Sequence, residues 1–273
     1  MDVLRSSTVP DGTSLTYRVW PASDPARARV GLFNGIMSHS AWFGPLAPGL
    51  TEVGLRLIGL DRRGSGLNET GRGDAPAASV FVDDALALIE AESDETPLFL
   101  VGWCWGAALA TAVAHALGDR VAGLVLVTPG MFNRPALHAA IEAQTERIAA
   151  AEPEAAVIDS PIDDTMFTRS DALETFVRAD AHRVQTISPR MLAVTKKLAT
   201  AATIRLRKLA VPVLVVLTDE DEATDNEATE TYFRKLPCDR VRIERVPGRH
   251  GVQFDAPRET TAAITAFIDE HLP

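Results

Sequence analysis

The sequence predicts an α/β protein built on a mostly parallel, doubly wound sheet. Short apolar runs rich in Val, Leu and Ile alternate with longer segments of helical period. The apolar runs are continuous, as expected when helices cover both faces of a parallel sheet. Strand–helix alternation of this kind implies right-handed crossovers between parallel strands. With 273 residues, the chain is long enough for one large domain or two small ones.

The expected strands and helices alternate along most of the chain. An early strand over residues 15–19, which we interpret as antiparallel, follows a turn at Asp11 and Gly12. The clearest buried strands cover residues 30–33, 55–60, 98–101, 123–127 and 213–217, and a further strand begins at Val241. The expected helices cover residues 41–53, 80–92, 105–117, 228–236 and 256–271.

One long stretch, residues 131–208, interrupts this alternation. It contains no convincing buried strand, but it has helical segments at 136–151 and 191–209. Pro153 and Pro161 bracket a loop, and Ser188 followed by Pro189 is typical of a helix start. We interpret this stretch as a helical cap over the carboxyl edge of the sheet. The core domain would then comprise residues 1–130 and 209–273.

The composition excludes several classes of function. A net charge of −10 argues against nucleic acid or an anionic membrane as a partner, because both bind basic surfaces. No apolar run is long enough to span a bilayer, and the first residues do not form a secretory signal. The two cysteines, Cys104 and Cys238, are interpreted as free thiols of a cytoplasmic protein. The six histidines lack metal-ligand spacing, so neither a metal nor another cofactor is expected.

The segment around Cys104 carries the strongest chemical signal. An apolar strand runs into Gly102-Trp103-Cys104-Trp105-Gly106, and an Ala-rich helix follows. This strand–turn–helix context is that of a nucleophile elbow, with Cys in the place of Ser. Small neighbours allow the strand and helix to approach closely, and the Trp105 N–H can face a developing oxyanion. The alternative is an ordinary buried cysteine, since free Cys is among the most buried residue types.

A second oxyanion donor is expected after the strand at residues 30–33. That strand ends in Asn34-Gly35, and the Ile36 N–H then lies where this kind of site places its second donor. The alternative is a simple Asn-Gly turn. Trp103 and Trp105 flank the nucleophile and are expected to wall a flat apolar site, although either could instead belong to the core.

An acid and a base complete the constellation. Acidic residues 219–225 follow the strand at 213–217, and the spacing favours Asp221 over Asp219 as the carboxylate of a triad. The alternative is a solvated acidic loop. His250 follows a strand and lies in a Gly-containing loop, which gives the chain order nucleophile, acid, base. His39 is a weaker candidate, and the other histidines are interpreted as surface or packing residues: His115, His138, His182 and His271.

With these motifs, almost the whole chain resembles the α/β-hydrolase superfamily, and within it the monoacylglycerol lipase and lysophospholipase-like branch. Residues 34–40 resemble the branch's His-Gly-x-x-x-His-Ser segment, and residues 60–67 resemble its Asp-x-Arg-Gly-x-Gly turn. The cap segment 160–167 is also similar. The resemblance implies an α/β-hydrolase fold with an eight-stranded sheet and a helical cap. It also implies an acid four residues before a second aspartate, which matches Asp221 and Asp225.

The chain departs from that branch at three positions. Cys104 replaces the usual Ser, Asn34 replaces a His, and Thr218 replaces a Gly. Similar Cys-containing elbows occur in dienelactone hydrolases and polyhydroxyalkanoate synthases. Because an acylated Cys is a thioester, these departures favour chemistry other than simple lipase action.

We therefore expect a cysteine-dependent esterase or thioesterase with a Cys104–His250–Asp221 triad. The expected substrate is a small acyl ester or thioester with an apolar acyl group, or an acyl group bound to a carrier. The alternatives are an acyltransferase or cyclase, and a non-catalytic binding protein of the same fold. The oligomeric state is left open. The residues expected to contact substrate are Asn34, Gly35, Trp103 and His39.

Overall fold

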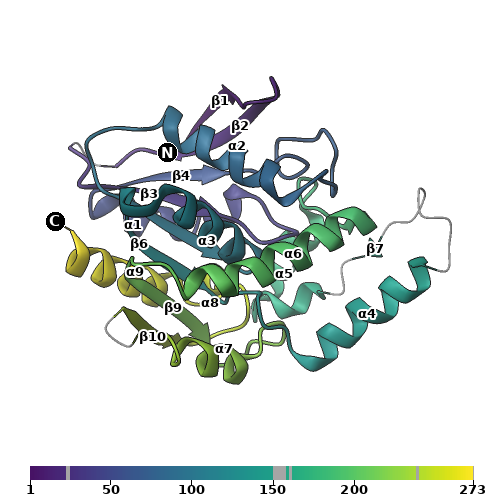
Figure 1. Cartoon of the computed structure of the whole chain (residues 1–273). Coiled ribbons are helices and arrows are strands. Elements are labelled where there is room, and N and C mark those ends of the chain that lie inside the picture. The colour runs from purple at the N-terminus through teal and green to yellow at the C-terminus, as the bar shows by residue number, and fades with distance from the viewer. Residues whose placement is uncertain (23–24, 150–157, 160–161, 238–239, 273) are drawn as a thin grey trace.

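A single eight-stranded sheet forms the centre of the molecule (Figure 1). The computed structural model describes residues 1–22, 25–149, 158–159, 162–237 and 240–272. The strand order is β1-β2-β4-β3-β5-β6-β9-β10; the β1–β2 and β2–β4 pairs are antiparallel and all other neighbours are parallel. The predicted mostly parallel sheet is thus confirmed. Its strands are β1 (Val3–Thr8), β2 (Ser14–Trp20), β3 (Ala28–Phe33), β4 (Leu55–Leu60), β5 (Leu98–Trp103), β6 (Val121–Val127), β9 (Val213–Thr218) and β10 (Val241–Val246).

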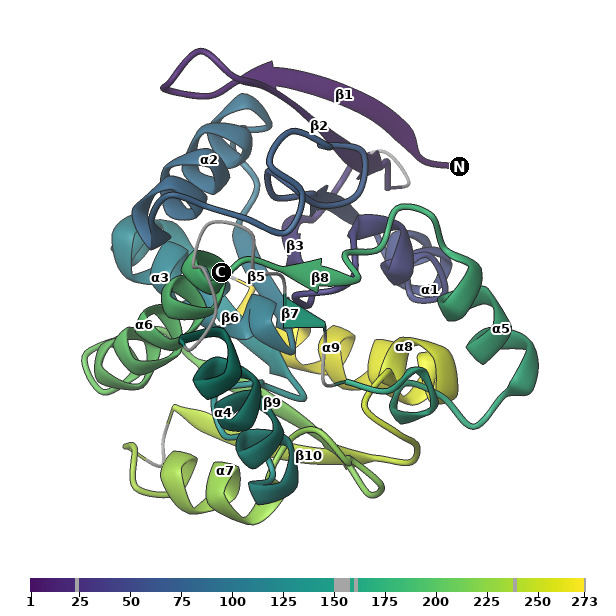
Figure 2. The ribbon, with the colours of Figure 1, turned by 90° about the vertical axis from the view of Figure 1, so that its right-hand side faces the viewer.

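Helices cover both faces of this sheet. On one face lie α2 (Ala78–Ala91), α3 (Trp105–Leu117) and α6 (Pro189–Leu206), which contact one another. On the other face α1 (Ala47–Glu52) packs against α9 (Pro257–His271), as Figure 2 shows. The remaining helices are α4 (Pro135–Ala149), α5 (Asp171–Ala179), α7 (Asn226–Phe233), α8 (Val252–Asp255), and the short 3-10 helices η1 (Ser40–Phe43), η2 (Gly118–Arg120) and η3 (Asp164–Met166).

The helix expected over residues 41–53 is divided into η1 and α1. Pro45 has no backbone N–H, so it cannot donate to a helical carbonyl, and the chain turns here through Gly44. The start expected at Ser188 is confirmed, because its side chain accepts a hydrogen bond from the Met191 N–H (2.9 Å) and Pro189 is the first helical residue.

The stretch 131–208 contains strands after all. β7 (Ile158–Asp159) and β8 (Thr186–Ile187) pair as a small antiparallel sheet. Two-residue strands are too short for a periodic pattern in the sequence, and so they were not expected. Several residues discussed above lie outside the described ranges, namely Cys238, Pro153, Pro161, the first residue of the segment 160–167, and the last two residues of the helix expected at 136–151.

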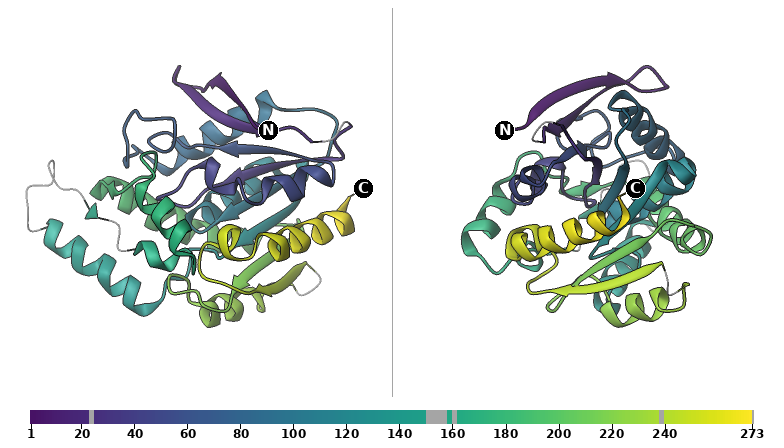
Figure 3. Two further views of the ribbon diagram at one scale, coloured as in Figure 1. Left: turned by 180° about the vertical axis from the view of Figure 1, so that it is seen from behind. Right: turned by 90° about the vertical axis from the view of Figure 1, so that its left-hand side faces the viewer.

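The inserted elements lie in two places. Figures 1 and 3 show α4, α5 and β7 beyond the carboxyl ends of the parallel strands. By contrast, α6 runs along α3 and belongs to the helical layer on one face of the sheet. Residues of the insertion therefore lie both above the strand ends and beside the helix that follows β5.

The strand register brings the loops of the site together. Phe33 on β3 is paired with Gly102 on β5, and Trp103 is paired with Val127 on β6. Thr218, the last residue of β9, is paired with Val246 on β10. Because the carboxyl ends of parallel strands meet at one edge, the loops after β3, β5, β9 and β10 converge there.

Candidate active site

Cys104 lies in the sharp turn between β5 and α3. Its φ of 54° and ψ of −120° are unusual for a residue with a side chain. Two glycines make the turn possible. A Cβ at Gly102 would lie 2.5 Å from the Gly106 carbonyl oxygen, and a Cβ at Gly106 would lie 2.1 Å from the Phe33 carbonyl oxygen. The local sequence therefore forms the strained turn that was predicted, with Cys104 at its apex.

His250 and Asp221 form a buried pair at the same edge of the sheet. Both side chains are fully buried, and His250 Nδ1 lies 3.0 Å from each carboxylate oxygen of Asp221. Asp221 Oδ1 also accepts hydrogen bonds from the N–H groups of Ala223 (2.9 Å) and Thr224 (2.8 Å). Asp219, the second candidate acid, is exposed. The structure thus brings Asp221, and not Asp219, to His250.

The pKa values of this pair move in opposite directions. Burial favours the neutral form of Asp221, but the positive charge of His250 and the hydrogen bonds outweigh it and lower the carboxyl pKa. Burial likewise disfavours the imidazolium, yet the charges of Asp221 and Cys104 raise the His250 pKa well above its usual range. Nε2 of His250 is buried, and Cys104 is the neighbour that raises the His250 pKa together with Asp221, through its charge and through a side-chain hydrogen bond that falls short of standard geometry.

The loop that carries His250 is held by both the core and the insertion. The His250 carbonyl accepts hydrogen bonds from Trp103 Nε1 (3.0 Å) and Thr128 Oγ1 (3.2 Å). The N–H of His250 donates to the Met166 carbonyl at 3.0 Å, and the N–H of Gly251 donates to the Phe167 carbonyl at 2.9 Å. The candidate base is therefore fixed by its backbone as well as by Asp221.

The loop after β3 lies against the elbow. A Cβ at Gly35 would be 3.4 Å from the Cys104 Cβ, which is ordinary contact distance, so the Gly35 backbone passes directly beside the elbow. Ile36 and Trp105, the two residues expected to supply oxyanion donors, both line the cavity that contains Cys104. Asn34, which was expected to contact substrate, is buried. Its side-chain amide donates to the carbonyls of Gly35 and Ser38, which fixes the loop from within.

The cavity beside Cys104 is narrow and mostly apolar, with a volume of about 90 Å³. One wall comes from the core and the other from the inserted elements α4, β7, β8 and α6. Its lining residues are Ile36, Met37, Cys104, Trp105, Gly130, Asn133, Leu137, Ile141, Ile158, Ile162, Val184, Gln185, Ile187, Leu192 and Thr195. Gly35 and Trp103 line a smaller space that is also bordered by Cys104.

His39 is placed apart from this cavity. It is buried, and its Nε2 lies 2.8 Å from Asp180, which also accepts a hydrogen bond from Trp42 Nε1 at 2.6 Å. Burial raises the Asp180 pKa, but these hydrogen bonds and the His39 charge lower it well below its usual range. His39 thus links the end of the oxyanion loop to the residue after α5 and does not line the Cys104 cavity.

The other histidines lie outside the Cys104 cavity. His115, His138 and His182 are exposed, and His271 Nδ1 lies 2.8 Å from the Phe267 carbonyl oxygen. Within the described ranges, no group of three His, Cys, Asp or Glu side chains is arranged to hold a metal ion. Nor does any described helix combine the length and apolar character needed to cross a bilayer.

Arg62 is a residue of the site that the sequence did not reveal. Its guanidinium is buried and donates to the carbonyls of Gly35 (Nη1, 3.0 Å) and Ile36, and it lies over the Trp105 ring at 5.0 Å from the centroid. Burial lowers the pKa of Arg62 to about 10, so the side chain stays charged at neutral pH. Two adjacent arginines after a strand resemble a solvated turn, and only the structure shows that one of them points inward.

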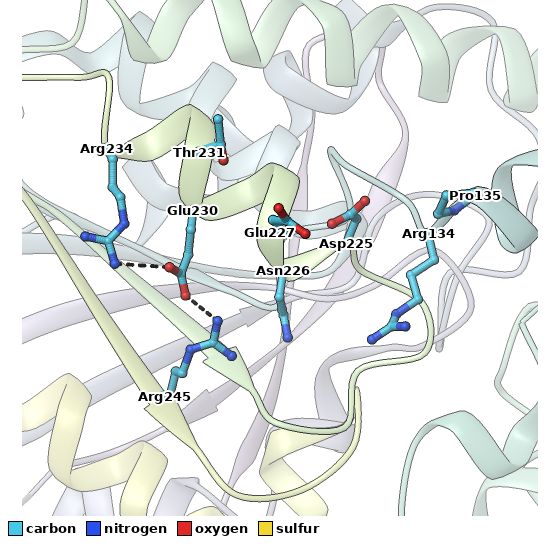
Figure 4. Close-up of a pocket in the computed structure, with 9 residues that line it drawn as sticks. All are labelled: Arg134, Pro135, Asp225, Asn226, Glu227, Glu230, Thr231, Arg234 and Arg245. Atoms are coloured by element: carbon cyan, nitrogen blue, oxygen red, sulfur yellow. Dashed lines mark hydrogen bonds and ion pairs between the residues drawn. The ribbon is translucent and has the colours of Figure 1, made fainter.

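A larger and more polar pocket of about 520 Å³ lies at α7 and shares no lining residue with the Cys104 cavity (Figure 4). Its Glu230 carboxylate is bound by Arg234 (3.1 Å) and Arg245. Asp225 caps α7 by accepting from the Ala228 N–H at 2.9 Å. These charges compensate one another, and the pocket contains none of the candidate catalytic groups.

The sheet order, the elbow after β5 and the sequence of nucleophile, acid and base define an α/β-hydrolase fold. Comparison with families agrees: the Hydrolase_4 family model, described as "Serine aminopeptidase, S33", matches residues 24–257. The chain belongs to this family, and it is similar to monoglyceride lipases.

Individual relatives are distant. Human monoglyceride lipase is 29% identical over 128 residues, which cover 46% of this chain and 42% of that protein. The chain thus aligns with about two-fifths of the length of this relative. Monoacylglycerol lipase of Mycolicibacterium smegmatis is 22% identical over 268 residues, covering 96% and 95% of the two chains.

Solved structures confirm the fold. A soluble variant of monoglyceride lipase from Saccharomyces cerevisiae, in complex with a substrate analog, superposes with a TM-score of 0.87 at 20% identity. The match covers 100% of this chain and 96% of that one. Monoacylglycerol lipase of Paleococcus ferrophilus gives a TM-score of 0.81 at 20% identity, covering 93% and 98%.

Proposed function

We propose that this protein hydrolyses esters or thioesters of apolar acyl groups, with Cys104 as the nucleophile. The observation that carries the proposal is the position of Cys104 at the apex of the elbow, beside the buried His250–Asp221 pair and at the base of an apolar cavity. The names of the relatives, which are lipases acting on monoglycerides, support an ester as the substrate. The Cys in place of Ser adds thioesters to the candidates.

The geometry supports a two-step mechanism. His250, held by Asp221, takes the Cys104 proton as a general base. The thiolate attacks the acyl carbon, and the N–H groups of Ile36 and Trp105 stabilise the oxyanion. The imidazolium then gives its proton to the leaving alkoxide or thiolate, which departs and leaves a thioester on Cys104. In the second step His250 takes a proton from water, whose oxygen attacks the thioester and expels Cys104 as thiolate.

The lining of the cavity supports an apolar acyl group. Isoleucine, leucine, methionine and valine side chains form most of its wall, and its polar members are few. Ile158 and Ile187 come from the small β7–β8 sheet, and Leu192 comes from α6. The acyl chain would therefore lie between the core and the inserted elements, while its carbonyl faces Cys104.

The test is to trap the acyl-enzyme. The protein is incubated with a panel of acyl esters and acyl thioesters, and its intact mass is measured at short times. We expect a mass increase equal to one acyl group in the wild type and none in Cys104→Ala. An unchanged mass with every donor, together with no turnover, would refute the proposal. Cys104→Ser then tests whether the thiol restrains ester hydrolysis, in which case its esterase rate rises.

Acyl transfer to another nucleophile is the second candidate. It is favoured by the thiol at position 104, because a thioester reacts more readily with amines and thiols than an ester does. Product analysis with added amines, thiols or alcohols separates the two activities. Transfer predicts that the acylated amine, thiol or alcohol replaces the free acid as the main product.

A further inference from the structure

Arg62 contacts both halves of the candidate oxyanion hole. Its guanidinium donates to the carbonyls of Gly35 and Ile36, on the loop that supplies one N–H, and it lies over the indole of Trp105, whose backbone supplies the other. The Trp105 indole is also held at its edge, since its Nε1 donates to Thr195 Oγ1 at 3.1 Å. Arg62 thus fixes two peptide segments that are far apart in the sequence.

The burial of this charge needs an explanation. Arg62 is 6% exposed, and its hydrogen bonds go to backbone carbonyl oxygens instead of a carboxylate. A buried charge without a bound carboxylate is unfavourable for stability, because desolvation is only partly compensated. The charges that act on Arg62 are those of Asp61, Arg72 and Cys104. The Asp61 carboxylate accepts hydrogen bonds from the N–H groups of Ser40 and Leu67 instead, so the guanidinium itself contacts the candidate oxyanion loop and the Trp105 ring.

We propose that Arg62 is a positioning residue of the oxyanion hole, which holds the Gly35–Ile36 segment and Trp105 in register and directs a positive charge towards the thiolate and the oxyanion. Polarisation of the Gly35 and Ile36 peptides by the guanidinium also orients their dipoles. The inference rests on the proposed function, since it concerns the same reaction. The residue touches no substrate atom and acts through the two donors.

The experiment compares Arg62→Met and Arg62→Lys with the wild type on an activated acyl ester. Met keeps much of the volume without the charge, and Lys keeps the charge without the planar fork. We expect kcat to fall about 100-fold in Arg62→Met, as when one oxyanion donor is lost, with KM within about threefold of the wild type. Affinity for an aldehyde inhibitor, which forms a tetrahedral adduct with Cys104, should fall by the same factor as kcat. In Arg62→Lys, both kcat and the affinity for the aldehyde inhibitor should lie between those of Arg62→Met and the wild type.

Arg29→Met is the matched control. Arg29 is also buried and donates to the backbone carbonyls of Glu92, Asp94 and Thr96, and unlike Arg62 it also pairs with a carboxylate, that of Asp94, at 3.1 Å. It lies at the start of β3, at the end away from the Gly35–Ile36 segment. The Arg29→Met variant should be less stable than the wild type and have the same kcat.

An Arg62→Met protein that melts earlier but keeps its kcat and its inhibitor affinity would overturn the inference, as would a rise in KM alone. If the wild type itself forms no acyl adduct, the proposed function fails instead. If Arg62→Met does not fold, Arg62→Lys supplies the same comparison.

Discussion

Among single residues, Asp221 is the one whose substitution should affect turnover most clearly. Its carboxylate binds His250 and itself accepts hydrogen bonds from two backbone N–H groups. Asp221→Asn keeps the size of the side chain but removes its charge, and it favours the wrong tautomer of the imidazole. We expect kcat to fall by about 10³- to 10⁴-fold, as in other triads. Asp219→Asn is the control, since Asp219 is exposed, and it should stay within about twofold. Equal losses in the two variants would show that the acid is misassigned.

The same pair predicts how stability depends on pH. A raised pKa such as that of His250 stabilises the fold fully below the unfolded pKa, and this contribution is lost as the pH rises through the folded pKa. A lowered pKa such as that of Asp221 stabilises the fold above its unfolded pKa, and is lost as the pH falls through the folded pKa. Both contributions are present between about pH 4.5 and 6.

The urea midpoint of Asp221→Asn should therefore lie furthest below that of the wild type in this window. The difference should shrink as the pH is raised beyond neutrality towards the folded pKa of His250. Urea titrations followed by tryptophan fluorescence at several pH values measure it. A difference that is independent of pH would mean that the pair is not ionised in the folded protein.

Among the structural elements, the elbow depends on how closely α3 approaches β3. Gly106→Ala would place a Cβ 2.1 Å from the Phe33 carbonyl oxygen and 2.7 Å from that of Asn34, and backbone atoms cannot move aside as a flexible side chain can. We expect the free energy of unfolding to fall by about 3 kcal/mol or more, measured by chemical denaturation. Turnover should fall with it, because the Trp105 N–H shifts.

Gly118→Ala tests the other end of the same helix. Gly118 has a φ of +57°, but no atom lies within 4 Å of the position of a new Cβ. The substitution should lower stability by only about 1–2 kcal/mol, through backbone strain, and leave turnover unchanged. A similar loss in both variants would mean that strain in the helix, and not its close approach to β3, governs the elbow.

These elements also show which parts could be predicted from the sequence. Continuous apolar runs identify β3, β5 and β9 because they are buried on both faces, and the glycines around Cys104 identify the elbow because its geometry demands them. The strands β7 and β8 were not predictable, since two residues carry no periodicity. The inward direction of Arg62 depends on the packing of three separate segments, which no local pattern encodes.

At the scale of the whole molecule, the cavity lies between the core and the insertion. We therefore predict that the side chains of the insertion determine which length of acyl chain the protein accepts. Leu192 on α6 lines the cavity, so Leu192→Ala enlarges it and should favour longer acyl groups. We expect the ratio of kcat/KM for a longer ester over a shorter one to rise about 10-fold, with a stability loss of about 2–3 kcal/mol. An acyl-chain series from short to long measures this ratio.

Leu198→Ala is the control for that series. Leu198 lies on the same helix and is 1% exposed, but it does not line the cavity. It should reduce stability to a similar extent and leave the chain-length profile as it is. A shift in both variants would show that loosening of α6, and not the volume of the cavity, alters the preference.

The hydrogen bonds from His250 and Gly251 to the carbonyls of Met166 and Phe167 restrict how this enzyme can be recombined with its relatives. Gly251 has no room for a side chain there, because a Cβ would lie 2.4 Å from the Phe167 carbonyl oxygen. A chimera that takes the whole insertion from another hydrolase would separate the imidazole from its backbone anchor. The segment around η3 should therefore be kept from this protein in any such chimera. The carbonyls of Met166 and Phe167 and the loop that carries His250 then come from the same protein.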